Sequence, residues 1–283
     1  MSTAEILGLA IVGVGVAVVL GVLFFHFVTA LWRVHFDRAI APGLFWAALG
    51  EAWAFMRIVL WNITGRSRLQ PEDVAEDADV VVVLVHGACA DGTCTTGWRR
   101  ALIAAGVNAP ILAPDHGLVV RSLSVHVART AAFIDRVRRR SPGARLVFVG
   151  HSMGGLVIRQ LLADDDVLRA ATLGVITVAS PHCGTASLRW VPFDAVSTLG
   201  HLQVGHAGLA GLPALEKLVA RSAFIASAVD VIVYPKTTSL PEGATVFSFD
   251  DVGHAALLVD AAVATQVAAL VVNMIEDAPP VVD

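Results

Sequence analysis

The chain has 283 residues, of which 56% are hydrophobic and 16% charged, and its formal net charge is −4. This length can hold one large domain or two small ones, and so apolar a composition indicates that part of the chain contacts lipid. Nucleic-acid-binding proteins usually carry an excess of positive charge, whereas this chain is net negative, so we expect no nucleic-acid partner. Three cysteines are too few for a disulfide framework, although Cys89 and Cys94 could either pair or stay reduced.

Residues 1–38 are predicted to form a transmembrane anchor. The segment Ile6–Leu31 contains one histidine and no residue with a formal charge. At about 1.5 Å per residue it is long enough to cross a hydrocarbon core about 30 Å thick. A cleaved signal peptide would need a basic start and a shorter apolar core, whereas this chain begins with the acidic stretch MSTAE. We therefore expect a retained, single-pass membrane helix.

Residues 39–78 are predicted to contain an interfacial helix followed by a linker. The segment Gly43–Trp61 is helical in composition and rich in tryptophan, but Glu51 and Arg57 interrupt it. We expect it to lie on the membrane or against the following domain; a second crossing is the alternative, and it would bury two charges. Thr64–Asp79 is polar and reads as the linker. One crossing would place the domain in the cytoplasm and two would place it outside, so the side of the membrane stays open.

Residues 79–283 are predicted to form an α/β catalytic domain, because β-branched apolar runs alternate there with amphipathic helical segments. The expected strands are Val80–His86, Ala109–Asp115, Arg145–Val149, Thr172–Val178, Ala228–Tyr234 and Thr245–Phe249. The expected helices are Gly97–Gly106, Val125–Arg140, Met153–Leu162 and Ala261–Ile275. Such alternation predicts a mainly parallel sheet with helices on both faces.

A G-x-S-x-G pattern lies between a predicted strand and a predicted helix, at Gly150-His151-Ser152-Met153-Gly154. In this setting the serine occupies a strained turn whose neighbours must be small, and its hydroxyl stands at the N-terminus of the next helix. Backbone amides at that terminus can face a developing negative charge. The pattern predicts that Ser152 is a catalytic nucleophile.

A serine nucleophile needs a base and an acid that orients the base, and in this architecture both follow the serine in the chain. His254 comes directly after the last predicted strand, where a loop can bring its imidazole over Ser152. Asp230, which precedes His254 in the chain and lies at the edge of an apolar predicted strand, is the predicted acid. Asp250 and Asp251 are rivals, although they are close to His254 in sequence and would approach it awkwardly.

The oxyanion hole needs two backbone donors. We expect one from Met153, the residue after the nucleophile, and one from Ala88, in the loop that turns at Gly87; Cys89 is an alternative to Ala88. No cluster has metal-ligand spacing and no phosphate-binding or dinucleotide-binding loop is present, so we expect neither a metal nor a cofactor.

Taken together and in order, several motifs resemble those of bacterial lipases and esterases of the α/β-hydrolase fold. They are VVVLVHGACADG, FVGHSMGGLVIRQLL, VASPHCGT, AVDVIV and VGHAALL. The resemblance runs from about Asp79 to the C-terminus and implies Ser152, Asp230 and His254 as the triad, with the amides of Ala88 and Met153 as the oxyanion hole. It also implies an insertion at about residues 187–228 that covers the acyl pocket as a lid, or packs as a plain cap. Cys183 departs from the family pattern within its loop.

These features together predict a membrane-anchored serine hydrolase that cleaves carboxylic esters. The anchor and the leucine-rich insertion favour a lipid or acyl ester as substrate, with the bilayer as partner. An acyltransferase of the same fold and a non-catalytic membrane-anchored binding module are the alternatives. The sequence leaves the oligomeric state open.

Overall fold

The computed structural model describes residues 20–21, 44–64, 70–88, 90–117, 122–188, 198–236, 240 and 246–278. The predicted membrane segment Ile6–Leu31 lies outside the described residues apart from residues 20 and 21, which are helical. Among the helices that the structure describes, none combines the length and the apolar character needed to cross a membrane.

A parallel six-stranded sheet forms the centre of the molecule, with strand order β2-β1-β3-β4-β5-β6. The strands are β1 (Val80–Val85), β2 (Ile111–Leu112), β3 (Arg145–His151), β4 (Thr172–Val178), β5 (Ser222–Ser227) and β6 (Val246–Phe249). Every residue of β1 is buried, because alternate valines pack into separate apolar clusters on the two faces of the sheet. An uninterrupted run of β-branched residues is what such a strand requires.

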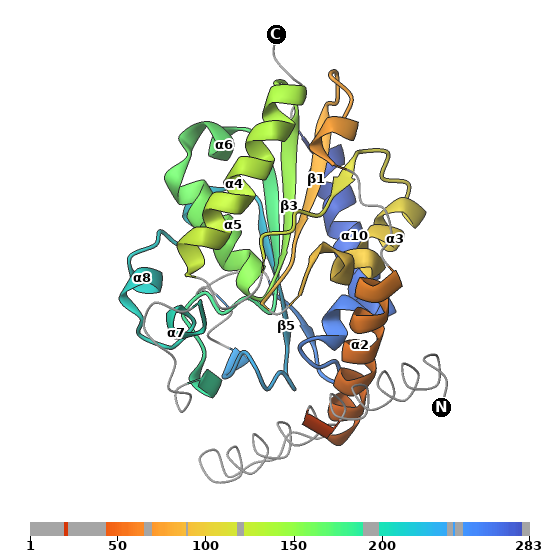
Figure 1. The fold of residues 1–283 in the computed structure, drawn as a ribbon, viewed down its shortest axis with the longest axis vertical. Helices are drawn as coiled ribbons and strands as arrows, with labels where there is room; N and C mark the ends of the chain where they lie inside the picture. The colour runs from red at the N-terminus through yellow and green to blue at the C-terminus, as the bar shows by residue number, and fades with distance from the viewer. Residues whose placement is uncertain are drawn as a thin grey trace, which may run out of the picture.

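Helices cover both faces of the sheet, which confirms the predicted α/β architecture (Figure 1). The helices α4 (Leu123–Arg140) and α5 (Met153–Asp164) lie on one face, and α3 (Thr96–Ala104) and α10 (Ala261–Glu276) lie on the other. Short helices complete the described chain: α6 (Asp166–Ala170), α7 (Thr198–His201), α8 (Ala207–Ala210) and α9 (Leu215–Leu218), with the 3-10 turns η1 (Pro71–Asp73), η2 (Gly92–Thr95), η3 (Ala186–Leu188) and η5 (Ala256–Leu258).

The strand order reverses beside β1. The chain passes from β1 through α3 to β2 at one edge, then returns through α4 to β3 on the other side of β1. In open parallel sheets, ligands bind outside the carboxyl ends of the strands at such a switch point. The loop after Val85 and the turn at Ser152 follow the two strands that flank this point.

The fifth strand lies earlier in the chain than we predicted. The predicted strand Ala228–Tyr234 is wrong: Ser222–Ser227 forms β5, and the residues after it form an irregular loop. Asp230 causes the break, because its Oδ1 accepts the backbone amides of Ile232 and Val233, both at 2.8 Å, and so closes a turn. Since β5 belongs to the central sheet, the predicted insertion at 187–228 cannot extend past Arg221.

The helix α2 (Leu44–Thr64) packs against the domain, one of the two placements that we expected for this segment. It lies beside α3 and α10, on the side of the sheet away from α4 and α5 (Figure 1). Its inner face buries alanines together with Ile58 and Trp61, and it also buries Glu51. Its outer face leaves Trp46 and Trp53 exposed.

Candidate active site

Ser152 occupies a strained turn between β3 and α5. Its φ of 53° and ψ of −123° lie outside the regions that residues with a side chain normally adopt. Two backbone hydrogen bonds hold this conformation: the Ser152 amide donates to the Val178 carbonyl at 2.8 Å, and the Gly155 amide donates to the Ser152 carbonyl at 3.1 Å. The sheet therefore imposes the turn, and α5 begins directly after it.

Glycine is required on both sides of Ser152 because the backbone is crowded there. A Cβ at Gly154 would overlap the carbonyl oxygens of Val85 and His86, at the end of β1. A Cβ at Gly150 would lie 2.6 Å from Ile158 Cδ1 and 2.7 Å from the Gly155 nitrogen. The glycines of the sequence pattern thus let the start of α5 sit directly against β1 and β3.

Asp230 and His254 form a buried pair. His254 Nδ1 donates to Asp230 Oδ2 at 2.7 Å, and the two side chains are 6% and 2% exposed. Because Asp230 Oδ1 accepts the two amides of its own turn, the loop holds both oxygens of the carboxylate in place. The exposed rivals Asp250 and Asp251 lie in the same loop as His254, but it is Asp230 that bonds to its ring.

This contact sets the protonation of the imidazole. With its hydrogen on Nδ1, His254 carries a lone pair on Nε2, as a general base requires. Burial acts to lower the pKa of His254, but the charge and the hydrogen bond of Asp230 outweigh it and raise that pKa above its ordinary value. The site therefore favours the imidazolium that forms when such a base accepts a proton.

His151 links the serine turn to the histidine loop. Its Nε2 donates to the backbone carbonyl of His254 at 3.0 Å, and the two rings lie 4.8 Å apart. Burial, and next the nearby charge of His254, hold the pKa of His151 far below its ordinary value, so it is neutral. The hydrogen bonds of the described residues do not include one between Ser152 Oγ and His254; such bonds often tighten only when substrate binds.

The loop after β1 lies against the serine turn. A Cβ at Gly87 would be 3.0 Å from both His151 Nδ1 and Ser152 Cβ, so a larger residue there would press on the serine turn. Half-buried Ala88 follows, and Met153 is the first residue of α5. The alternative donor Cys89 lies outside the described residues.

Three buried histidines support the loop after β1. His86 Nδ1 donates to the Gly87 carbonyl at 2.8 Å, and His116 Nε2 donates to the His86 carbonyl at 3.0 Å. The rings of His86 and His116 stack at 3.7 Å, and the Nδ1 atoms of His116 and His126 are 3.1 Å apart. Burial, and next the proximity of His86, lower the pKa of His116 to about 3, so it stays neutral and acts through hydrogen bonds rather than charge.

Arg159 is a structural residue that the sequence reasoning missed. From the buried side of α5, its guanidinium donates to the carbonyls of His182 at 2.7 Å, Leu212 at 2.7 Å and Pro213 at 2.8 Å. It therefore ties the short-helix segment that holds α8 and α9 to the helix that follows Ser152. A charged residue in the apolar stretch LVIRQLL was the available signal.

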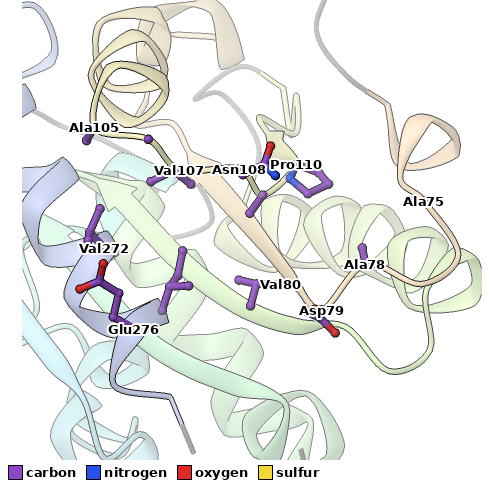
Figure 2. Close-up of a pocket in the computed structure, with 13 residues that line it drawn as sticks. Ala75, Ala78, Asp79, Val80, Ala105, Val107, Asn108, Pro110, Val272 and Glu276 are labelled. Atoms are coloured by element: carbon purple, nitrogen blue, oxygen red, sulfur yellow. The ribbon is translucent and has the colours of Figure 1, made fainter. Parts of the chain in front are cut away.

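The cleft in Figure 2 lies away from this arrangement. It has a volume of about 540 Å³ and is lined by the residues before and at the start of β1, the turn after α3 and the end of α10. These segments are at the amino ends of the strands, whereas Ser152 follows a carboxyl end. A second cleft, of about 530 Å³, lies between α4 and the segment around His201 and Leu209. In the described part of the chain no group of three or more His, Cys, Asp or Glu residues could hold a metal ion.

Comparison with known proteins identifies the fold. The sequence family described as alpha/beta hydrolase fold matches residues 80–192. Among solved structures, Est1E from Butyrivibrio proteoclasticus is similar at 13% identity over 74% of this chain and 93% of its own, with a TM-score of 0.54. The mature lipase BlEst2 of Bacillus licheniformis is 16% identical over 65% of this chain and 88% of its own, with a TM-score of 0.52.

Lipase B of Aspergillus fumigatus is also similar, at 16% identity over 64% of this chain and a TM-score of 0.53, and the match spans about half (49%) of that protein. No curated protein sequence matches the chain. At these identities the neighbours establish the α/β-hydrolase fold and leave the chemistry to be argued from the site itself.

Proposed function

We propose that this α/β-hydrolase-fold chain is a serine hydrolase of carboxylic esters, with Ser152 as nucleophile, His254 as base and Asp230 as the acid that orients the base. The observation that carries the proposal is the buried Asp230–His254 pair, at 2.7 Å, beside a strained serine turn. His151, next to Ser152 in the chain, bonds to the backbone of His254 and so supports the placement of the two parts together.

In the proposed reaction, Ser152 Oγ attacks the acyl carbonyl carbon of the ester while His254 Nε2 takes the hydroxyl proton. The resulting imidazolium is stabilised by the carboxylate of Asp230, and its proton passes to the leaving alcohol. An acyl-enzyme remains on Ser152. His254 then accepts a proton from water as the water attacks the acyl carbon, and it returns that proton to Ser152 when the acid is released.

Negative charge on the acyl oxygen needs two donors. We assign them to the backbone amides of Ala88 and Met153. Contact of Gly87 with Ser152 supports the first assignment, and the position of Met153 at the start of α5 supports the second. The aligned amides at that helix start add a favourable field.

The outer face of α2 supports lipid or long-chain acyl esters as substrates and a membrane-bound location. Trp46 is 70% exposed and Trp53 is 57% exposed, and tryptophan prefers the lipid–water boundary. The uncharged segment Ile6–Leu31, which precedes this helix in the chain, has the length of a membrane anchor. In this proposal the anchor and the tryptophans hold the catalytic site at the surface where such esters reside.

A fluorophosphonate probe tests the chemistry. The full-length protein should be labelled and the Ser152→Ala variant should not, while both remain folded. Hydrolysis of p-nitrophenyl butyrate should fall on the order of 10⁴–10⁶-fold in the variant. If the wild-type protein is not labelled and hydrolyses no member of a p-nitrophenyl ester series from acetate to palmitate, the proposal is wrong.

A further inference from the structure

Resting on the proposed function, we infer that Glu51 of α2 is a positioning residue for His254: its buried carboxyl group holds the histidine loop in place from outside the sheet-and-helix domain. Glu51 is 205 residues from its hydrogen-bond partner in this loop. The helix that carries it is thereby part of the active-site structure and more than a connection to the membrane.

The carboxyl group contacts the chain on both sides of His254. Glu51 Oε1 accepts the backbone amide of Ala256 at 2.9 Å. On the other side, a Cβ added at Gly253 would lie 2.6 Å from Glu51 Cγ and 2.8 Å from Cδ, so the carboxyl group fills the space that this glycine leaves open. The residue before His254 and the turn that begins after it are thus both fixed by one side chain.

The environment of Glu51 is unfavourable for a glutamate whose only role is to stabilise the fold. The residue is fully buried, at 0% exposure, and within the described part of the chain its Oε2 has no hydrogen-bond partner. An unsatisfied oxygen on a buried carboxyl group reduces stability, and an apolar side chain of similar size would avoid that loss. Costly ionisable groups of this kind cluster at functional sites.

Charge couples Glu51 to the proposed triad. Burial raises the pKa of Glu51 to about 7, while the amide of Ala256 and the charge of His254 oppose the rise and the charge of Asp230 adds to it. In return, an ionised Glu51 raises the pKa of His254, in the same direction as Asp230. The charged groups that face His254 are therefore Asp230 and Glu51, and neutral His151 contacts it from β3.

The test compares three variants of the full-length protein on p-nitrophenyl butyrate. Glu51→Leu removes the acceptor and should lower kcat by about 10- to 100-fold with KM nearly unchanged, because small displacements of a catalytic group have effects of this size. Glu51→Gln keeps an acceptor for the Ala256 amide and should retain most of kcat. Because Gln cannot carry the charge, the acid limb of its kcat/KM profile should move to lower pH, an effect that a purely structural role would not produce. Met56→Ala, at another exposed position of α2, is the control and should match the wild type.

A double-mutant cycle covers the case in which Glu51→Leu does not fold. Gly253→Ala should lower kcat in the wild-type background, because its Cβ displaces the carboxyl group, and should do so less in the Glu51→Ala background, where that group is absent. Equal effects of Gly253→Ala in the two backgrounds would overturn the inference. So would a folded Glu51→Leu variant within twofold of wild type, a Glu51→Gln variant as impaired as Glu51→Leu, or a Glu51→Gln variant that is insoluble while the control is soluble. Fluorophosphonate labelling of the wild type separates these results from failure of the proposed function, which would abolish labelling altogether.

Discussion

Replacing Asp230 with asparagine changes little in the size of the side chain but reverses one of its hydrogen bonds. Asp230 Oδ1 accepts two amides of its own turn, so the asparagine oxygen will stay there and its NH₂ group will face His254. In the wild-type protein, His254 Nδ1 donates to the Oδ2 atom that the NH₂ group would replace. Two donors cannot bond to each other. The imidazole must therefore move its hydrogen to Nε2, where the lone pair is needed to accept the proton of Ser152.

We expect the Asp230→Asn variant to lose about 10⁴-fold in kcat, equivalent to about 5.5 kcal/mol of transition-state stabilisation. The folding loss should be much smaller, about 1–2 kcal/mol, because one charge-assisted hydrogen bond is weakened and the turn is kept. Stopped assays with p-nitrophenyl butyrate measure the first effect and urea unfolding measures the second.

Asp250→Asn and Asp251→Asn are matched controls, since these exposed residues lie in the same loop as His254. Both should stay within twofold of the wild-type kcat. An Asp230→Asn variant within tenfold of wild type, or a large loss confined to either control, would refute the assignment of the acid.

Further predictions concern the parts that support the site. Arg159→Leu removes three charge-assisted hydrogen bonds to carbonyls and should lower the free energy of unfolding by about 3–4 kcal/mol, whereas Arg138→Leu, which breaks a part-exposed ion pair, should change it by less than about 1 kcal/mol; urea unfolding of both variants checks this. Since burial lowers the pKa values of His116 and His182 to about 3, the folded state keeps them neutral while the unfolded state binds protons below pH 6.5. Each of these two histidines should therefore lower the free energy of unfolding by about 1.4 kcal/mol per pH unit as the pH falls from 6.5 towards 3. Glu51, with its pKa raised to about 7, opposes this between pH 7 and 4.5, so Glu51→Gln should steepen the loss measured in unfolding at pH 7.5 and 5.5. A truncation that begins at α2 should stay soluble and hydrolyse p-nitrophenyl butyrate, whereas one that also removes α2 should aggregate or lose activity, because it uncovers apolar surface and strands a buried amide; equal behaviour in size-exclusion chromatography and hydrolysis would contradict the contact seen at α2.

Local signals in the sequence were enough to predict the architecture and the serine turn. A buried parallel strand needs an unbroken β-branched run, and a strand-to-helix turn with a serine at its tip needs glycines beside it, so both leave a short, readable pattern. The α/β class and the parallel sheet are confirmed for these reasons. The order of acid and base along the chain likewise indicated Asp230 and His254, which the structure brings into contact.

Only the tertiary structure decided where the supporting contacts fall. The sequence predicted a strand over Ala228–Tyr234, because a buried loop rich in valine has the same sequence pattern as a buried strand. In the structure, Ser222–Ser227 pairs with β4 instead. The contact of Glu51 with Ala256 spans 205 residues and that of His151 with His254 spans 103. Neither follows a helical or strand period, so no local pattern records it. The role of a charged residue inside an apolar helix cannot be predicted from the sequence, because it depends on which group the side chain contacts in the folded protein. For Glu51 that group is the Ala256 amide in the histidine loop.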